Sequence, residues 1–356
     1  MKTIHYYIMA LLLFFGMAAE SHAADDVIVK PFSIAAGETK KIEVELIQED
    51  KEYTALNFDI VLPEGFTITK NPRGRFNVTL NNEVVDDHQL TMGMIQTENH
   101  YRLIVACQSL YTFQKSGTLM TIEIHASDMI NTGTYTCQMT KKNLVIDSNT
   151  STLPEDTECD VECRIDAKVS ALGYATFSWP RALDFTNTNV EAFIATEETE
   201  DLLMLTKVAY VPASTGIILK GSADTYHPQT TDMATDNVSG NLLSATDAAT
   251  FKVEGNDIYV LSNKKEGKPG FYPAVSGLEI PKYKAYLQSS NEAKMLWFGE
   301  SENATDISSK QIVDAATEVY DVMGRHVSND ASSFLNKTTS KHKGTYIIDR
   351  KKYNIK

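Results

Sequence analysis

Beyond its first 23 residues, the 356-residue sequence has no second long apolar run. A helix that crosses a bilayer needs about 20 consecutive, mostly apolar residues. We therefore expect the remainder of the chain to be soluble or surface-attached, without a transmembrane segment. Basic residues are also scarce relative to acidic ones, 33 against 47, which gives a formal charge of −14 and a pI near 5.1. An acidic surface argues against nucleic acid and anionic membranes as partners, whereas metal cations and neutral glycans stay compatible with it.

Sequence motifs of catalysis are absent as well. There is no HExxH motif, no G-x-S-x-G motif and no Gly-rich phosphate loop. The histidines of the mature chain are far apart in sequence, and we expect them to be surface residues: His88, His100, His125, His227, His326 and His342. The protein is therefore predicted not to be an enzyme. A secreted hydrolase with an unrecognised site stays as a further alternative.

Metal-binding patterns are equally weak. Asp86 and Asp87, and also Glu155, Asp156 and Asp160, lack the D-x-[DN]-x-[DN]-G spacing of a calcium loop. We interpret these groups as solvated acidic turns, with a calcium ion held between loops as the alternative. No cofactor and no other metal is expected.

Cysteine is rare, and its four copies all lie in the first half of the mature chain: Cys107, Cys137, Cys159 and Cys163. An even number in an exported protein favours one or two disulfides, and three complete pairings are open. If "ECDVEC" is extended, Cys159 and Cys163 lie about 13 Å apart, too far to bridge each other. Each would then pair with Cys107 or Cys137. A zinc site is the alternative, but CxxxC has no second closely spaced pair or histidine cluster beside it.

The N-terminus itself has the pattern of a secretory signal peptide. Lys2 precedes an apolar run from Ile8 to Ala19, and the small-x-small triplet Ser21-His22-Ala23 follows. The run is too short to span a bilayer comfortably, so a membrane anchor is the less favoured reading. We expect residues 1–23 to be removed by cleavage after Ala23. The residue directly after that point is alanine and not cysteine, which argues against lipid attachment.

Residues 26–168 have the pattern of a β-sandwich. Short segments alternate apolar with polar residues and are separated by Gly, Pro, Asn or Asp. In "KKIEVELIQ", Ile42, Val44 and Leu46 share one face. The stretches "PFSIAAGETKKIEVELIQEDKEYTALNFDIVLPEGFTI" and "SLYTFQKSGTLMTIEIHA" resemble the cohesin-like, carbohydrate-binding-like sandwich domains of bacterial surface proteins. That resemblance implies that Gly37-Glu38-Thr39 opens a strand and that Leu62-Pro63-Glu64-Gly65 turns the chain out of one.

A second strand-rich block covers residues 169–302. "KVAYVPASTGIILKG" is typical of two strands around a Pro-Ala-Ser-Thr-Gly turn. The motifs "GYATF", "VPASTGIILKG" and "GFY" with "IPKYKAYL" resemble, in this order, an all-β module of large secreted bacterial surface proteins. The resemblance implies no catalytic role.

The chain closes with a polar linker, residues 303–317, and a strand-rich tail, residues 318–356. "EVYDVMGRHV" and "KGTYIIDRKKYNIK" resemble the Ig-like, Por-type C-terminal sorting tails that the type IX export machinery recognises. An insert at residues 328–343 is longer and more polar than in such tails. The matching positions are Tyr320, Gly324, Arg325, Val327, Gly344, Tyr346, Ile347 and Lys352. We predict that the tail is an export address, against the alternative of a purely structural hairpin.

The expected architecture is therefore all-β: a cohesin-like sandwich, a second all-β domain and a small C-terminal β unit. We predict an exported protein at the cell surface, with the periplasm as the alternative location, that binds a glycan or another extracellular component. Exposed aromatic rings would stack on sugar rings, and the candidates are Tyr111, Trp179 and Tyr272. A scaffold or adhesion module that binds a surface protein through a sheet face is the alternative, and it requires an exposed apolar patch with a polar rim.

Overall fold

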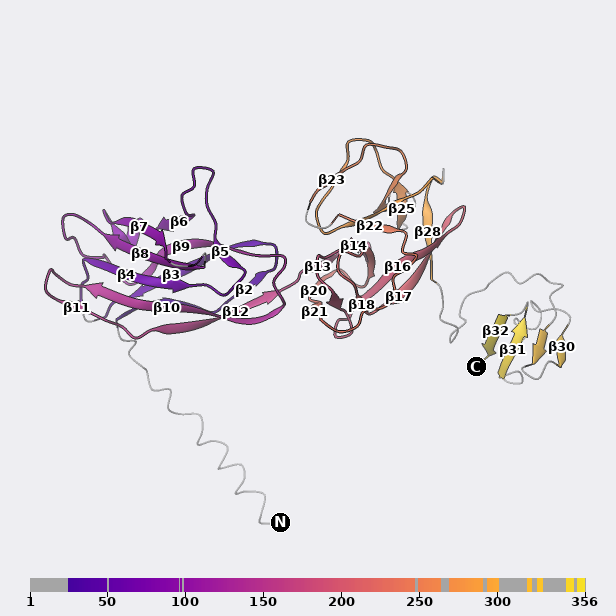
Figure 1. Ribbon diagram of the computed structural model, residues 1–356, viewed down its shortest axis with the longest axis horizontal. Helices are drawn as coiled ribbons and strands as arrows, with labels where there is room; N and C mark the ends of the chain where they lie inside the picture. Colours follow the sequence, from indigo (N-terminus) through magenta and orange to yellow (C-terminus); the bar gives the residue numbers. More distant parts are fainter. Residues whose placement is uncertain are drawn as a thin grey trace, which may run out of the picture. The chain divides into compact units, whose positions relative to one another are not determined.

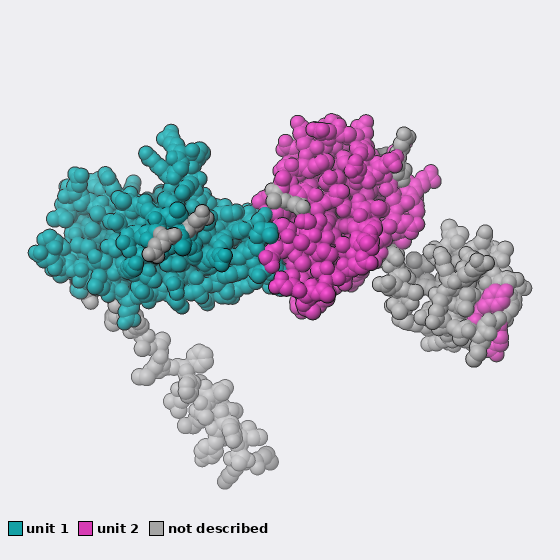
Figure 2. Space-filling view, viewed as in Figure 1, with its two compact units in different colours: residues 1–167, 225–230 teal, residues 168–224, 231–356 magenta. Residues whose placement is uncertain are grey.

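The computed structural model describes residues 25–49, 51–95, 97, 99–246, 249–263, 269–290, 293–300, 319–321, 325–328, 344–348 and 351–355. The chain divides into two compact units, shown in different colours in Figure 2. The first consists of Met1–Ala167 and Thr225–Thr230, and the second of Lys168–Asp224 and Thr231–Lys356. Nearly all regular structure is β-strand (Figure 1), so the predicted all-β class is confirmed.

The first unit contains two sheets. One, here called the β3 sheet, has the order β1-β3-β9-β5, with β6 also paired to β9. Its strands are β1 (Asp26–Val29), β3 (Thr39–Ile47), β5 (Phe66–Ile68), β6 (Val78–Leu80) and β9 (Gly117–Ala126). The other, the β4 sheet, has the order β2-β12-β10-β4-β8-β7, with β11 paired to β10. Its strands are β2 (Phe32–Ala35), β4 (Ala55–Val61), β7 (Gln89–Met94), β8 (His100–Ala106), β10 (Gly133–Val145), β11 (Ser151–Thr152) and β12 (Thr157–Arg164).

Alternation in the sequence decides which face of each strand is buried. Ile42, Val44 and Leu46 of β3 are all buried, as predicted, because successive side chains of a strand point to opposite faces. The inward faces of the two sheets meet in a common core. Its buried side chains include Val44, Leu46, Phe58, Ile60, Leu103, Val105, Ile122, Ile124, Leu144 and Val161. Each such side chain contributes about 1.5–3 kcal/mol of burial free energy.

Contacts between the sheets show that they form a sandwich. The Tyr101 hydroxyl of β8 accepts a hydrogen bond from the Ile68 amide of β5 at 3.1 Å. Phe66 of β5 packs edge-on against Tyr135 of β10, with ring centroids 5.5 Å apart. The predicted turn at the end of β4 is also present, because the Phe66 amide donates to the Pro63 carbonyl at 3.1 Å while Gly65 has φ +85°. Gly37, before β3, likewise has φ +73°.

Among the described residues the one helix is α2 (Asn82–Val85), which the sequence reasoning did not predict. The side chain of Asn81 accepts a hydrogen bond from the Glu83 amide and so caps its start. Val84 and Val85 are buried, which anchors this turn to the sandwich. No helix of the described residues is long and apolar enough to cross a bilayer.

The second unit is built on one large sheet of order β14-β19-β16-β17-β28-β25-β24-β27-β22. Its strands are β14 (Tyr174–Phe177), β16 (Glu191–Glu198), β17 (Leu202–Val208), β19 (Ile217–Lys220), β22 (Leu243–Ala245), β24 (Ile258–Ser262), β25 (Gly270–Pro273), β27 (Ala285–Gln288) and β28 (Leu296–Glu300). One face packs into a core of buried side chains that includes Phe193, Leu203, Leu205, Ile218, Tyr259, Phe271, Leu287 and Leu296.

Smaller sheets complete the described structure. They include the pair β15 (Leu183–Asp184) and β18 (Tyr210–Val211) and the pair β23 (Phe251–Lys252) and β26 (Glu279–Ile280). Further short strands are β13 (Ala167–Val169), β20 (Asp224–Tyr226) and β21 (Gln229–Thr230). The predicted strands on either side of the Pro-Ala-Ser-Thr-Gly turn are β18 and β19. Ser214, inside that turn, has φ +56°.

Near the C-terminus the structure contains a four-stranded sheet of order β30-β29-β31-β32. Its strands are β29 (Val319–Asp321), β30 (His326–Ser328), β31 (Gly344–Ile348) and β32 (Lys351–Ile355). The predicted small C-terminal β unit is confirmed as a fold, and its role in export stays a prediction. Gly324, the linker at 303–317 and residues 1–23, with the expected cleavage point at Ala23, lie outside the described residues.

Candidate functional site

The outer face of the β4 sheet, opposite the core, gathers polar side chains from neighbouring strands. In the antiparallel pair β4–β8, Asp59 lies opposite Arg102, and Asn57 lies opposite Ile104. These residues alternate with the buried Phe58, Leu103 and Val105, so they must point outward. Register between two strands, rather than nearness in sequence, brings them together.

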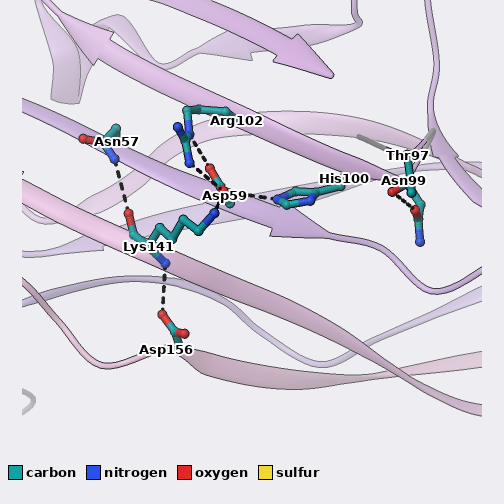
Figure 3. A network of polar contacts seen from close by, with 8 residues as sticks. All are labelled: Asn57, Asp59, Thr97, Asn99, His100, Arg102, Lys141 and Asp156. Carbon is teal, nitrogen blue, oxygen red and sulfur yellow. Dashed lines mark hydrogen bonds and ion pairs between the residues drawn. The ribbon is translucent and has the colours of Figure 1, made fainter. Parts of the chain in front are cut away.

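Asp59 and Arg102 form a two-pronged ion pair across the sheet (Figure 3). Arg102 Nε donates to Asp59 Oδ1 at 2.6 Å, and Arg102 Nη2 donates to Asp59 Oδ2 at 2.9 Å. The Asp59 side chain has no exposed surface, whereas that of Arg102 is 39% exposed. Paired donors of this kind hold the guanidinium in one plane and one direction.

Two further basic groups surround the same carboxylate. His100 Nε2 lies 3.1 Å from Asp59 Oδ2, and Lys141 Nζ lies 3.6 Å from that oxygen. We call Asp59, His100, Arg102 and Lys141 the Asp59 cluster. Even with a neutral histidine, the four members of the cluster combine two cations with one anion.

The backbone around the cluster is itself held in place. Lys141 occupies a bulge of β10 with φ +51°. The Asn57 side-chain amide donates to the Lys141 carbonyl at 3.2 Å, and the Lys141 amide donates to Asp156 Oδ1 at 3.0 Å. Before His100, the Asn99 amide group donates to the Leu62 carbonyl at 2.6 Å. Figure 3 shows the contacts that Asn57 and Asp156 make with Lys141.

The surroundings of Asp59 favour its ionised form. Burial by itself opposes ionisation, but the hydrogen bonds from Arg102 and His100 and their nearby charges outweigh it, so the pKa of Asp59 lies below its usual 3.8. The same hydrogen bond raises the pKa of Arg102. The pair is therefore permanently charged at neutral pH.

An apolar side chain and an acidic strip flank the Asp59 cluster. Ile104 is the next outward-facing residue after Arg102 on β8, and its exposed fraction is 40%. On β12, Glu158, Asp160 and Glu162 are exposed and point outward, because Cys159, Val161 and Cys163 between them are buried. The face thus carries one exposed apolar side chain, Ile104, beside the basic residues of the Asp59 cluster, and an acidic strip on β12.

The three aromatic residues predicted to bind glycan do not lie in a common exposed site. Tyr111 is 51% exposed, as expected. The expectation for Trp179 and Tyr272 is wrong, because they are only 5% and 4% exposed. Trp179 packs between Tyr283, with centroids 4.4 Å apart, and Phe177 at 6.1 Å. Large rings in a strand-rich segment bury more apolar area in the core than they can keep available for a ligand.

The expectation that the histidines are surface residues is also wrong for His88. It is 5% exposed, its Nε2 lies 3.0 Å from the Thr54 carbonyl oxygen, and its ring stacks on Phe113 with centroids 4.3 Å apart. The ring is fixed by core packing and backbone carbonyls. His88 is therefore a structural residue.

The cysteines are free thiols in this structure, so the predicted disulfides are not formed in it. Cys137, Cys159 and Cys163 are buried, and Cys107 is partly exposed. Within the described residues no group of three or more His, Cys, Asp or Glu side chains is placed to hold a metal ion. Asp156, one of the acidic turn residues, instead binds the Lys141 amide.

One depression in the second unit has a volume of about 460 Å³ and is a candidate for a hydrolytic site. Its lining residues are Asn256, Asp257, Tyr259, Pro273, Ser289, Ser290, Ala293 and Lys294. Asp257 is the one carboxylate among these, and it accepts a hydrogen bond from the Gln288 amide at 2.6 Å. The depression does not bring together the paired acid and base that general acid–base hydrolysis needs.

The Asp59 cluster was not predicted from the sequence. The signal was present: Asp59 interrupts the apolar "NFDIV", and Arg102 interrupts "YRLIVA". A charge of each sign at outward positions of two strands suggests a cross-strand ion pair once their register is known.

No protein-family model and no curated protein matches the sequence. Among solved structures, the chain is similar to cohesin modules. A non-cellulosomal cohesin from the archaeon Archaeoglobus fulgidus is 11% identical over 40% of this chain and 91% of its own, with a TM-score of 0.32. A cohesin–dockerin complex from Clostridium thermocellum gives 13% identity, 40% and 99% coverage and a TM-score of 0.34. A type III cohesin module of Ruminococcus flavefaciens is 9% identical over 42% of this chain and 93% of its own, with a TM-score of 0.28.

Proposed function

We propose that this protein is an exported, non-catalytic module that binds a protein partner through the outer face of the β4 sheet. The observation that carries the proposal is the Asp59–Arg102 ion pair beside the exposed Ile104. Export is supported by the signal-peptide pattern at the N-terminus and by the resemblance of the C-terminal tail to sorting tails. A protein-binding role is supported by the resemblance of residues 26–168 to cohesin-like domains.

Arg102 is suited to recognition because its position is set before any partner arrives. Two of its nitrogens bind Asp59, and Nη1 has no partner among the described residues. A preorganised guanidinium loses little side-chain entropy on binding, and arginine is enriched among the residues that dominate interface energies. Arg102 would donate a hydrogen bond to a carboxylate or a backbone carbonyl of the partner.

Ile104 and the acidic strip complete the recognition surface. Ile104 supplies a small apolar contact next to the cation, and Glu158, Asp160 and Glu162 present negative charge further across the sheet. A partner must then offer an apolar side chain and a carboxylate to β8, and basic residues to β12. Such bipolar complementarity sets orientation and selects against wrong partners.

A protein fits this surface better than a glycan does. Sugar rings are bound by exposed aromatic faces, and of the three aromatic residues predicted for that role only Tyr111 is exposed. Tyr111 follows β8 in the loop after Cys107 and is not a member of the Asp59 cluster. Arg102 belongs to a residue type that is enriched in protein interfaces, and Ile104 adds an exposed apolar side chain beside it.

The test uses two variants of the mature protein, one that introduces a charge on the face and one that removes a charge from it. An affinity-captured envelope protein is purified, and its binding is measured by calorimetry. Ile104→Asp and Arg102→Ala should each weaken binding by about tenfold or more, which corresponds to 1.4 kcal/mol. The matched control is Thr79→Asp, which adds the same charge at an exposed position of β6 in the other sheet.

Equal losses for Thr79→Asp and Ile104→Asp would refute the assignment of the face. Binding of a saccharide that requires Tyr111 and ignores both β8 variants would favour the glycan alternative instead. Affinity for the protein partner should also fall with added salt, since the contact of Arg102 with a carboxylate is partly screened.

A further inference from the structure

Two of the four cysteines lie directly opposite each other across neighbouring strands. In the antiparallel pair β10–β12, Cys137 is the register partner of Cys159. Their side chains point to the same, inner face of the sheet and are 0% and 7% exposed. Direct partners in antiparallel strands have Cα atoms about 4.5–5.5 Å apart, which lies within the separation that a disulfide spans.

The register excludes the other pairings. Cys163 is the partner of Gly133, four residues along β10 from Cys137 and therefore about 13 Å away along the strand. Cys159 and Cys163 are separated by the same distance on β12. Cys107 follows β8, and β4 lies between β8 and β10, which puts it about 10 Å from β10 sideways. Neither separation can be bridged without moving the backbone.

We propose that Cys137 and Cys159 are a modification site at which oxidation forms a single cross-strand disulfide, with Cys107 and Cys163 left as thiols. The proposal therefore replaces the three complete pairings that the sequence left open with one disulfide between register partners. It does not rest on the proposed binding function, although the bond lies on the inner side of two strands of the binding face. Linking them holds β12, with its acidic strip, in register with β10.

The two thiols also interact directly in the folded sandwich. A hydrogen bond from the Cys137 thiol lowers the pKa of Cys159, and the same interaction raises the pKa of Cys137. Both sulfurs are buried in the folded sandwich, so the exchange belongs to folding, before β12 has packed onto β10.

The oxidant is an external disulfide, either that of a thiol–disulfide oxidoreductase or of a small molecule. The thiolate of one of the two cysteines attacks one sulfur of it and releases the other as a thiolate, which leaves a mixed disulfide on that cysteine. The other cysteine, after losing its proton, then attacks the protein sulfur of the mixed disulfide and releases the second thiolate. Two protein thiols and one disulfide become one protein disulfide and two thiols. The two protons that leave the cysteines end on the released thiols.

The experiment refolds the full mature chain from denaturant in a buffer of reduced and oxidised glutathione, then blocks remaining thiols under denaturing conditions. The reactive thiols should fall from four to two, and the unblocked protein should be lighter by about 2 Da. Digestion after lysine, arginine and glutamate separates Cys159 (residues 159–162) from Cys163. The non-reduced digest should contain residues 159–162 linked to the peptide that carries Cys137.

Variants make the assignment decisive. Cys107→Ser and Cys163→Ser should keep the crosslink, while Cys159→Ser should abolish it. Far-ultraviolet circular dichroism of each variant shows whether it has folded. Four reactive thiols in folded wild-type protein from the same buffer, or a bond to Cys163 or Cys107, would overturn the proposal. A partner-binding defect in the face variants leaves this outcome unaffected, so the two proposals fail separately.

Discussion

Lys142 Nζ lies 2.9 Å from Asp26 Oδ1 and joins β10 of one sheet to β1 of the other through the core. The Lys142 side chain has no exposed surface, whereas that of Asp26 is 20% exposed. A buried lysine is tolerated only with a partner, because removing an ammonium ion from water costs several kcal/mol. The pair fixes how the two sheets of the first unit meet at this edge.

Removing one member of the Asp26–Lys142 pair should destabilise the protein, because the other member keeps its charge without a partner. We expect Lys142→Ala to lower the free energy of unfolding by about 2–4 kcal/mol, because Asp26 keeps a partly buried charge. The double variant Asp26→Leu/Lys142→Met should be much less damaging, since apolar residues of similar volume replace a buried ion pair at little cost. Urea denaturation of each measures the difference. A double variant as unstable as Lys142→Ala would contradict this account.

Acid should remove the contribution of the Asp59 ion pair. Because the pKa of Asp59 in the folded protein is lowered, its stabilisation is complete above the unfolded value near 3.8 and is lost as the pH falls through the folded pKa. At pH 7 we expect Asp59→Asn to cost about 1–3 kcal/mol. Below the folded pKa the variant and the parent should converge. The control is Asp87→Asn, at an exposed position, and a pH-independent gap for Asp59→Asn would refute the assignment.

The turn after β4 depends on glycine at position 65. Gly65 has φ +85°, and an added Cβ would meet Ile130 Cδ1 at 3.3 Å. Gly65→Ala should lower the stability of the first unit by about 1–2 kcal/mol, since a left-handed conformation strains a residue with a Cβ. Gly93→Ala, in β7 with nothing within 4 Å, is the matched control and should be neutral or slightly stabilising. Similar midpoints for both variants in thermal unfolding would count against the turn geometry.

Trp179 should behave as a core residue and not as a ligand-binding one. Trp179→Ala is expected to destabilise the second unit by about 3–5 kcal/mol, because it leaves a cavity beside Phe177 and Tyr283. Trp179→Phe should cost far less, since Trp179 Nε1 is buried without a hydrogen-bond partner that would be lost. Calorimetric unfolding separates the two variants. A Trp179→Ala protein as stable as the parent would contradict the core role of Trp179 and favour ligand binding at the surface instead.

Local patterns were enough to predict the class and many of the strands. The alternation in β3 and the turn residues around Gly65 act over a few residues, and the structure confirms both. The small helix α2 was missed, because four residues stabilised by the Asn81 cap and by burial of Val84 and Val85 carry no helical period. The roles of the N-terminal segment and of the tail stay predictions.

By itself the sequence determined that the chain is built of strands, because the side-chain period of two is a local property of the backbone. The tertiary structure alone decided which strands are neighbours. That choice places Arg102 against Asp59, puts Cys137 opposite Cys159 and buries Trp179. Asp59 and Arg102 are 43 residues apart in the chain. Partners so distant are selected by sheet order and register, which depend on how the whole core packs and cannot be derived from short stretches of sequence.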